Sequence, residues 1–439
     1  MIPILEYEFL ECKPSVYKFS KKILVEDKPG QPSSAAETPM TRITLLGSTG
    51  SIGTSTLDVV RRRPHEFSTF SLVAGRNADL LSSQIREFRP KLAVVGDAET
   101  ADSLAKCLKA SNLPRHEWPQ LDYGRKARVQ AATAAETDFV MSAIVGVAGL
   151  EATFEGIRAG KRIGLANKEV LVASGKLVME AARARGVDLL PVDSEHNGAH
   201  QCFRAGRREE VTRLLLTASG GPFRDLPADQ LWSVTPEQAL QHPTWKMGQR
   251  ITIDSATMMN KGFEVIEACW LFDLAPSEVE VVVHPQSSIH AMVEYSDGSV
   301  IAQASATDMR MPIQYALTYP RRESAPVPTL DWATPRTWNF YPPDPAKFPL
   351  LRLSYEALKV GGSATCTLNA ADEIAVGAFL EGKIPFPAIA QTIEETLGRQ
   401  PVREPETIEQ VIEIDEASRE TARRVLGASS RPTGLTVRG

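Results

Sequence analysis

The sequence predicts an α/β protein with an N-terminal Rossmann-like doubly wound parallel sheet, a following α+β domain and a C-terminal helical domain. Short apolar segments alternate with amphipathic stretches of helical length between residues 42 and 192, which is typical of βαβ units. A glycine-rich turn follows the first apolar segment. After Pro191 the alternation is lost, and beyond about residue 350 the pattern is mostly helical. These three observations set the order of the domains.

The elements of the first sheet are predicted one by one from these apolar runs. Six strands are expected, at Ile43–Leu46, Phe70–Ala74, Leu92–Val95, Phe139–Ile144, Ile163–Ala166 and Val187–Val192. Between them the apolar residues recur with helical spacing, as on the buried face of an amphipathic helix. The clearest of these helices are expected at Ile52–Arg63, Leu80–Phe88 and Leu150–Ala159.

The rest of the chain divides where the composition changes. We expect domains at 41–192, 193–318 and 350–428, with a proline-rich linker at 319–349. Residues 1–40 end in a Pro/Ser/Ala-rich stretch and are expected to be a disordered extension. An over-long start-site assignment is the alternative, whereas a transit peptide would contain fewer acidic residues.

Composition excludes several classes of protein. Hydrophobic residues make up 43% of the 439 residues and charged residues 23%, which is ordinary for a globular protein and excludes a disordered or collagen-like chain. A net charge of -5 argues against a dedicated nucleic-acid binder. The five cysteines include no Cys-x-x-Cys pair, so a reducing compartment is expected. The longest apolar stretch, Phe139–Leu150, is too short to span a membrane, and no secretory signal is visible. We therefore expect a cytoplasmic protein.

The glycine-rich turn is the first candidate binding site. Its glycines at 47, 50 and 53 lie between a predicted strand and a predicted helix. Glycines allow the backbone to approach a pyrophosphate, and the first N–H groups of the helix favour its negative charge. A simple connecting turn is the alternative, but the position after the first strand of a βαβ series favours a dinucleotide site.

Arg76 follows the second predicted strand and bears on the choice of dinucleotide. An NAD site usually places Asp or Glu there to hold the ribose 2′-hydroxyl, whereas Arg suits the 2′-phosphate of NADP. Asp79 is close in sequence, and a solvated surface arginine is the alternative. The pattern favours NADP.

Asp193 and Glu195 form a candidate metal site after the sixth predicted strand. Two residues apart on an extended chain, their carboxylates would point to one face. Open α/β folds bind ligands at the carboxyl ends of their strands, and oxygen ligands suit Mg²⁺ or Mn²⁺. The alternative is a solvated acidic turn. His196 could be a third ligand or an ordinary hydrogen-bonded histidine.

A helix that begins near Thr257 could bring further polar groups to this site. Lys261 and Glu264, three residues apart, would share one face of it. Ser255, Asn260 and Lys261 are the donor types that a phosphate needs, and Glu264 could supply a third carboxylate. A routine Lys–Glu helical pair is the alternative.

Two loops could complete the site. Ser219 and the two glycines after it offer a hydroxyl and free backbone N–H groups, so they could bind a second anion. The segment His242–Gly248 contains a histidine, a tryptophan and a glycine, and such loops can close over a site and exclude water. A plain turn with a packed tryptophan is the alternative for this second loop.

Together and in this order, the motifs resemble the 1-deoxy-D-xylulose 5-phosphate reductoisomerase family. The likeness spans about residues 41–425 and does not cover 1–39. The blocks that carry it are Gly-Ser-Thr-Gly-Ser-Ile-Gly (47–53), Ala-Asn-Lys-Glu (166–169), Pro-Val-Asp-Ser-Glu-His-Asn (191–197), Thr-Ala-Ser-Gly-Gly-Pro-Phe (217–223), Asp-Ser-Ala-Thr-Met-Met-Asn-Lys-Gly (254–262) and His-Pro-Gln-Ser (284–287).

The resemblance implies a role for individual residues. The ligands of Mg²⁺ or Mn²⁺, with Co²⁺ as a further candidate, would be Asp193, Glu195 and Glu264, and these would be catalytic together with Lys168. Substrate contacts around the metal would include Lys168, Ser194, Glu195 and Glu264. Contacts to the phosphate end would come from Ser219, His242, Ser255, Asn260 and Lys261. NADPH contacts would come from Thr49, Gly50, Ser51, Ile52, Gly75, Arg76, Asn77, Asn167, Glu169 and Gly248. His290 would be a nearby orienting histidine. Many members carry Lys where this chain has Arg76, which keeps the charge.

The resemblance also implies a reaction. The 41–192 domain would bind NADPH, and the 193–318 domain would bind the metal and a sugar phosphate. The metal would act as a Lewis acid on the vicinal oxygens of 1-deoxy-D-xylulose 5-phosphate. Retro-aldol and aldol steps and hydride from NADPH would give 2-C-methyl-D-erythritol 4-phosphate, in the methylerythritol phosphate route of isoprenoid biosynthesis. A homodimer is implied by the family alone.

Two alternatives remain open at this point. Another NADP-dependent, semialdehyde-type dehydrogenase would need an activated cysteine, and no cysteine lies in a recognisable catalytic setting. A non-catalytic nucleotide-sensing module would not require three carboxylates beside a phosphate site.

Overall fold

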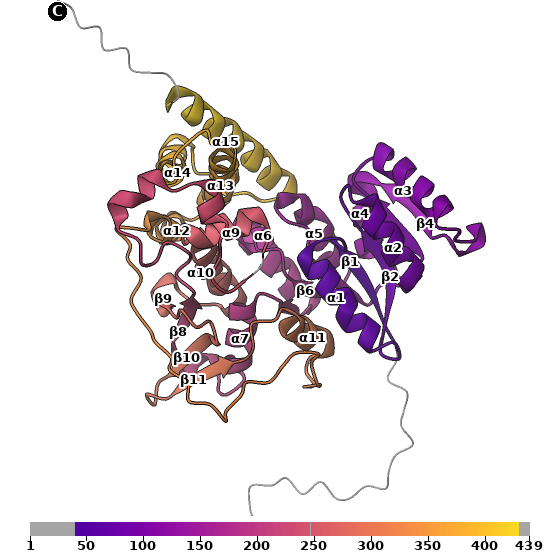
Figure 1. The fold of residues 1–439 in the computed structure, drawn as a ribbon, viewed down its shortest axis with the longest axis horizontal. Coiled ribbons are helices and arrows are strands. Elements are labelled where there is room, and N and C mark those ends of the chain that lie inside the picture. The colour runs from indigo at the N-terminus through magenta and orange to yellow at the C-terminus, as the bar shows by residue number, and fades with distance from the viewer. Residues whose placement is uncertain (1–39, 246, 430–439) are drawn as a thin grey trace, which may run out of the picture. The chain divides into compact units, whose positions relative to one another are not determined.

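A computed structural model describes residues 40–245 and 247–429 (Figure 1). The extension expected at 1–40 therefore lies outside the described residues, apart from Met40. None of the helices in these two ranges is both long enough and apolar enough to cross a membrane.

The first sheet is parallel throughout and has seven strands in the order β4-β3-β2-β1-β5-β6-β7. Its strand order reverses at β1, whose neighbours β2 and β5 lie on either side of it. The expected doubly wound sheet is thus confirmed. The strands are β1 (Thr41–Leu46), β2 (Phe67–Val73), β3 (Leu92–Val95), β4 (Gln120–Tyr123), β5 (Phe139–Ser142), β6 (Arg162–Leu165) and β7 (Leu189–Pro191).

Helices cover both faces of this sheet, which is why its strands are apolar on both sides. Consecutive strand residues alternate between two cores: Leu45 and Leu72 pack with α1, α2, α3 and α11, whereas Leu46 and Val73 pack with α4, α5 and α6. These helices are α1 (Ser51–Arg62), α2 (Ala78–Phe88), α3 (Ala98–Ala110), α4 (Gly124–Thr133), α5 (Leu150–Arg158), α6 (Glu169–Arg185) and α11 (Arg310–Thr318).

Strand β4 was not predicted from the sequence, and its composition explains why. Its residues are Gln, Leu, Asp and Tyr, and none of the four is buried. As an edge strand it pairs on one side only, with β3, so it needs no apolar run. Hydrophobic patterning detects burial rather than hydrogen bonding, and a partly solvated edge strand escapes it.

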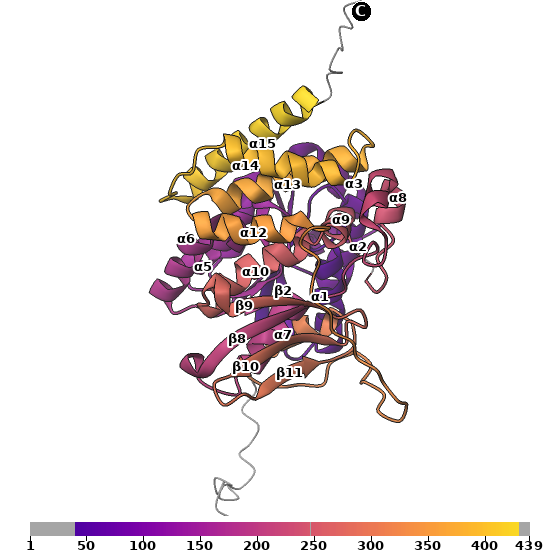
Figure 2. The same cartoon turned by 90° about the vertical axis from the view of Figure 1, so that its left-hand side faces the viewer.

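The second sheet has the order β11-β10-β8-β9, in which only β8 and β9 are parallel. Its core is shared with α7 and α10, and α10 lies close to β9 and β8 in Figure 2. The elements of this region are α7 (Ser194–Phe203), β8 (Val211–Ala218), α8 (Pro236–Ala239), α9 (Gln249–Ala256), α10 (Met259–Phe272), β9 (Val279–Val283), β10 (Ile289–Tyr295) and β11 (Val300–Ala304).

Four helices form the C-terminal region, in agreement with the helical pattern of the sequence: α12 (Pro349–Val360), α13 (Ala364–Leu380), α14 (Pro387–Arg399) and α15 (Ile408–Ser429) (Figure 2). They pack against other parts of the chain. Ile408 and Val411 of α15 enter the first-sheet core of α4, α5 and α6, and Leu368 of α13 shares the core of α10. The described residues between α11 and α12 contain an isolated bridge from Tyr341 to Val283 but no longer strand or helix.

The stability should decrease as the pH is lowered, because of a partly buried histidine. His200 of α7 lies 2.9 Å from the Tyr315 hydroxyl of α11, and burial together with Arg204 lowers the pKa of His200 to about 4. The unfolded chain, with a histidine pKa of about 6.5, therefore binds more protons between pH 6.5 and 4. Acid in this window should favour unfolding, by up to about 2 kcal/mol at pH 5.

The test compares urea unfolding at pH 8 and pH 5. His200→Gln, which cannot titrate, should lose less stability between the two pH values than the wild type. His116→Gln, at an exposed histidine, is the control and should behave as the wild type. Equal losses in wild type and His200→Gln would show that His200 does not contribute.

Candidate active site

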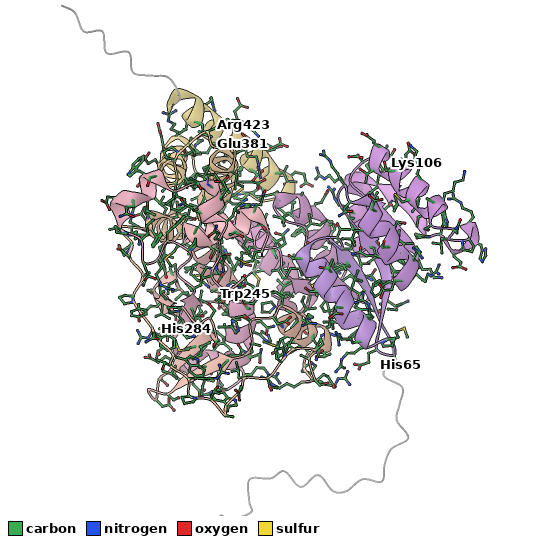
Figure 3. The ribbon with its side chains drawn as sticks, viewed as in Figure 1. His65, Lys106, Trp245, His284, Glu381 and Arg423 are labelled. Atoms are coloured by element: carbon green, nitrogen blue, oxygen red, sulfur yellow. The ribbon has the colours of Figure 1, made fainter. Side chains whose placement is uncertain are left out.

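A cavity of about 780 Å³ lies at the carboxyl edge of the first sheet. Its walls come from the segments after β1, β5, β6 and β7, from the end of β8, and from α9 and α10. Trp245 also lines it, and Figure 3 shows this side chain between the violet first-sheet elements and the second sheet. The position beside the strand-order reversal is the one at which doubly wound sheets bind ligands.

The glycine turn is shaped by close backbone contacts. Gly47 has a φ of +93°, and a Cβ atom on Gly53 would lie 2.2 Å from the Gly47 carbonyl oxygen. Only glycine fits at either position. The helix α1 then starts at Ser51, and its N-cap Gly50 has no side chain to bond the first N–H groups. These groups face a cavity lined by Gly50, Ser51 and Ile52, which suits a pyrophosphate.

The other residues expected at the dinucleotide divide into two sets. Asn167, Glu169 and Gly248 line the cavity, whereas Thr49, Gly75, Arg76 and Asn77 do not. The last three nevertheless follow β2, whose Val73 carbonyl accepts hydrogen bonds from Gly47 N and Ser48 N. They are exposed beside the turn, where an extended ligand could reach them.

Three carboxylates converge beside the cavity, and two of them, Asp193 and Glu195, line it. The oxygens of Asp193, Glu195 and Glu264 lie within 4.8 Å of one another. Glu264 is fully buried, and the side chains of Asp193 and Glu195 are 15% and 14% exposed. Such an all-oxygen donor set fits a hard divalent cation such as Mg²⁺ or Mn²⁺.

The backbone that presents Asp193 and Glu195 differs from the expected one. The prediction placed both on an extended chain with alternating faces, but α7 already starts at Ser194 and Asp193 is its N-cap. Glu195 therefore projects from the first helical turn. Negative side chains are favoured at this end of a helix by its dipole, so the helix start replaces the strand alternation as the cause of their convergence.

Two lysines lie among these carboxylates. Lys168 contacts Asp193 and lies 3.5 Å from Glu264, and Lys261 contacts Glu264 and lies 3.9 Å from Glu195. Burial alone would raise the pKa of Glu195, but Lys261, His290 and Lys168 outweigh it and hold that pKa well below its usual range. The Glu195 carboxylate is therefore ionised at neutral pH, as a metal ligand must be.

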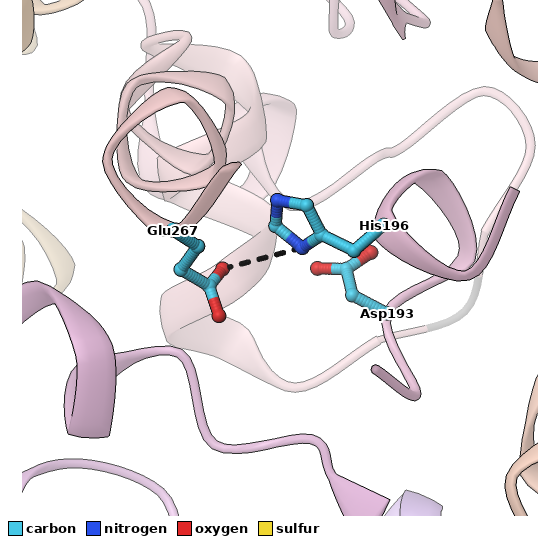
Figure 4. A group of neighbouring side chains, drawn as sticks. All are labelled: Asp193, His196 and Glu267. Atoms are coloured by element: carbon cyan, nitrogen blue, oxygen red, sulfur yellow. Dashed lines mark ion pairs between the residues drawn. The ribbon is translucent and has the colours of Figure 1, made fainter. Parts of the chain in front are cut away.

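A second donor group shares Asp193 with the first. It joins Asp193 to His196 and Glu267, whose Nδ1 and Oε2 atoms are 3.6 Å apart (Figure 4). Burial raises the pKa of Glu267 to about 8 and lowers the pKa of His196 to about 3, so both are uncharged at neutral pH. Neither lines the cavity. The group with Glu195 and Glu264 is the better cation site, because two of its members reach the cavity.

Polar donors gather at the phosphate end that the sequence predicted. Ser219, His242, Ser255, Asn260 and Lys261 all line the cavity. His242 Nδ1 accepts hydrogen bonds from Trp245 N and Thr244 N, which places the proton of the neutral ring on Nε2, 3.0 Å from Ser219 Oγ. The histidine thereby joins the 242–245 segment to the end of β8. Ser194 Oγ donates instead to Glu195, at 2.9 Å.

Two residues of the site were not singled out from the sequence. Glu267 lies three residues after Glu264 on α10, and this helical spacing could have indicated it. Arg250 lines the cavity and bonds to carboxylates on α6 and α13. Partners 81 and 122 residues away leave no local signal, so only the folded chain reveals the role of Arg250.

Three family models match the chain in succession. Residues 43–175 match 1-deoxy-D-xylulose 5-phosphate reductoisomerase, residues 189–272 its C-terminal domain, and residues 304–421 the DXP reductoisomerase C-terminal domain. These ranges include all strands of both sheets except β9, β10, the first two residues of β1 and all but the last residue of β11.

Individual relatives agree with the models. The chain is 65% identical over 398 residues to the 1-deoxy-D-xylulose 5-phosphate reductoisomerase of Solibacter usitatus (strain Ellin6076), covering 91% of this chain and 100% of the relative. The corresponding protein of Geotalea uraniireducens (strain Rf4) is 49% identical, with 88% and 99% covered.

Solved structures of this family also resemble the chain. The Zymomonas mobilis enzyme in complex with NADPH is 44% identical with a TM-score of 0.82, over 88% of this chain and 99% of that one. A DOX-P reductoisomerase in complex with NADPH, fosmidomycin and magnesium is 37% identical with a TM-score of 0.83, over 89% and 100%.

Proposed function

The chain belongs to the 1-deoxy-D-xylulose 5-phosphate reductoisomerase family, and from this premise we propose a role for each wall of its cavity. The protein is an NADPH- and divalent-metal-dependent enzyme that rearranges and reduces 1-deoxy-D-xylulose 5-phosphate to 2-C-methyl-D-erythritol 4-phosphate, a step of isoprenoid biosynthesis. The observation that carries the assignment of this reaction to the cavity is the meeting of three carboxylates with phosphate-type donors beside a glycine turn.

Asp193, Glu195 and Glu264 would hold the divalent cation, and Lys168 would contact the substrate next to it. When bound there, the cation supplies Lewis-acid activation of the substrate oxygens. The carboxylates fix its position, while the Lys168 ammonium, only 9% exposed, can orient a substrate oxygen by hydrogen bonding. His290, 3.6 Å from Glu195, would help to hold that carboxylate in place.

The phosphate of the substrate would lie at the other end of the carboxylate group. Ser219, Ser255, Asn260 and Lys261 supply hydroxyl, amide and ammonium donors there, and the backbone N–H of Gly221 donates to Ser219 Oγ at 3.2 Å. Binding energy from this non-reacting group can orient the reacting end. His242 would hold Ser219 and the 242–245 segment in the arrangement that excludes water.

NADPH would lie along the carboxyl edge of the first sheet. Its pyrophosphate would occupy the turn of Gly50, Ser51 and Ile52, its adenosine ribose would reach Arg76, and its nicotinamide end would meet Asn167, Glu169 and Gly248. Under this proposal the 41–192 domain binds NADPH and the 193–318 domain binds cation and sugar phosphate. The two meet at the cavity, which brings the hydride donor to the rearranged substrate.

We also propose that the protein is a homodimer. Strand β11 is an edge of the second sheet, and Val300 and Ile301 on it are 48% and 38% exposed. Exposed apolar edges are usually paired or protected. A second copy related by a two-fold axis could pair its own β11 there.

The four described cysteines are free, which supports the proposed cytoplasmic location.

Removing one carboxylate should abolish the metal-dependent reaction but not cofactor binding. Glu264→Gln keeps the size of the side chain and removes its charge. Turnover should fall more than about 100-fold, which exceeds the loss usually seen when a residue that only supports a metal ligand is replaced. NADPH affinity, measured by fluorescence, should persist because the glycine turn is unchanged. Glu267→Gln on the same helix is the matched control, and it should change the dependence of turnover on Mn²⁺ concentration less than Glu264→Gln does. A larger change in Glu267→Gln would place the cation in the second donor group, with Asp193 and His196.

Arg76→Ala should lower the preference for NADPH over NADH. Only NADPH would lose a charge-assisted hydrogen bond, so its KM should rise by about 10-fold or more while that of NADH changes little. The control is Arg86→Ala, at an exposed arginine of α2. An unchanged ratio of kcat/KM for the two cofactors would remove Arg76 from the site.

A charge on the β11 edge should separate the homodimer. Ile301→Lys places an ammonium group in the proposed strand pairing, and the mass measured by light scattering should fall towards that of one chain at micromolar concentration. Trp332→Lys, at a residue outside β11 that is 70% exposed, should leave the mass unchanged. A dimeric Ile301→Lys protein would place the interface elsewhere.

A further inference from the structure

The C-terminal helices contact two charged side chains of the cavity wall: Arg250, and Asp254, whose carboxyl group lies beside that of Asp372 on α13. None of the described residues of α12, α13, α14 or α15 lines the cavity. Arg250 does line it, and three of the groups that its guanidinium contacts belong to α13. The residues proposed above for the chemistry all lie outside these helices, so the connection of the helices to the site calls for an explanation.

The guanidinium of Arg250 is held from two sides. On the cavity side, Nη1 donates to Glu169 Oε1 at 2.9 Å, where Glu169 is the first residue of α6. On the other side, Nη2 donates to Asn369 Oδ1 at 2.8 Å and to Asp372 Oδ2 at 3.2 Å, and Nη1 donates also to Glu373 Oε2 at 3.2 Å. Asp254 lies 3.8 Å from Nε. The arginine fork therefore links α9, α6 and α13.

A second layer of charges fixes the partners on α13. Glu373 Oε2 accepts a further hydrogen bond from Arg419 Nη2 of α15 at 2.7 Å, and Arg419 also pairs with Asp415 at 2.6 Å. Asp372 and Asn369 are fully buried. Buried groups of this kind have few alternative positions, so α13 presents a rigid set of acceptors to Arg250.

Both neighbours of Arg250 on the cavity side are proposed NADPH contacts. Glu169 receives its hydrogen bond, and Gly248 ends the loop two residues before it, at the N-cap of α9. A lysine could not replace this link, because a single ammonium cannot reproduce the planar fork that serves acceptors on opposite sides. The side chain of Arg250 is only 16% exposed, so its position is set by these partners rather than by solvent.

We propose that Arg250 is a positioning residue through which α13 holds Glu169 and the Gly248 end of α9 in the arrangement that binds the nicotinamide end of NADPH. This inference rests on the proposed function, since it takes Glu169 and Gly248 as cofactor contacts. It assigns the C-terminal helices a task in cofactor affinity, carried by Asp372 and Asn369 from outside the cavity.

The decisive comparison is between two buried aspartates of the same region. Asp372→Asn removes a charged acceptor of Arg250, whereas Asp415→Asn removes one that bonds only Arg419. Asp372→Asn should raise the Kd of NADPH, measured by fluorescence titration of the full-length protein, by about 3- to 30-fold, the range for residues that act on a site through others. Asp415→Asn, which can act on Arg250 only through Arg419 and Glu373, should raise the Kd by less, although both variants should show similar melting temperatures. The KM for the sugar phosphate should stay within about twofold in both.

Two further variants test the route. Arg250→Lys should weaken NADPH binding at least as much as Asp372→Asn. In a Glu169→Gln background the Asp372→Asn change should add little, because the two act in series. If Asp372→Asn and Asp415→Asn bind NADPH equally, the inference is wrong. It is also wrong if NADPH affinity and sugar-phosphate KM worsen together, which would indicate general loosening. Absence of NADPH-dependent turnover in the wild type would instead refute the proposed function itself.

Discussion

The meeting of three carboxylates in a largely buried place is the constraint on which the rest of the site depends. Asp193, Glu195 and Glu264 repel one another, and burial weakens the screening by water that would reduce this repulsion. The approach is possible because two lysines bring ammonium groups to them: Lys168, the N-cap residue of α6, and Lys261 of α10. The same concentration of oxygen ligands is what a divalent cation requires, so a cation held here, as proposed, would reduce the same repulsion that the two lysines reduce.

Secondary structure supports this arrangement from several directions. The N-terminus of α7 favours Asp193 and Glu195, and His196 on the same helix bonds through Nε2 to the backbone carbonyl of Glu264 at 2.9 Å. This contact fixes α7 against α10. Because α10 also packs in the core of the second sheet and α12, the position of Glu264 depends on residues far from the reaction. The Arg250 contacts extend the same dependence to α13 and α15.

Local features of the sequence predicted a large part of this structure. Parallel strands buried on both faces are apolar runs. All six expected strands therefore agree with observed ones to within a few residues at each end, and Leu92–Val95 agrees at both ends. The seventh strand, β4, has no buried residue and left no such pattern. The extended geometry expected for Asp193 and Glu195 was wrong, because the helix starts one residue after Asp193 and two-residue spacing alone does not distinguish the two conformations.

The sequence by itself determined the class of fold, the glycine turn and the types of residue at the site, since these depend on periodicity and on chemistry within short segments. Only the tertiary structure decided which groups meet. Glu264 joins Asp193 from about seventy residues away, and Arg250 finds Asp372 more than a hundred residues further along. Such pairings depend on how helices pack across two sheets, and no local pattern encodes that packing. Glu267, which the sequence analysis did not single out, forms a second donor group with Asp193 and His196, and only the folded chain shows that this group has one member on the cavity where the group with Glu195 and Glu264 has two.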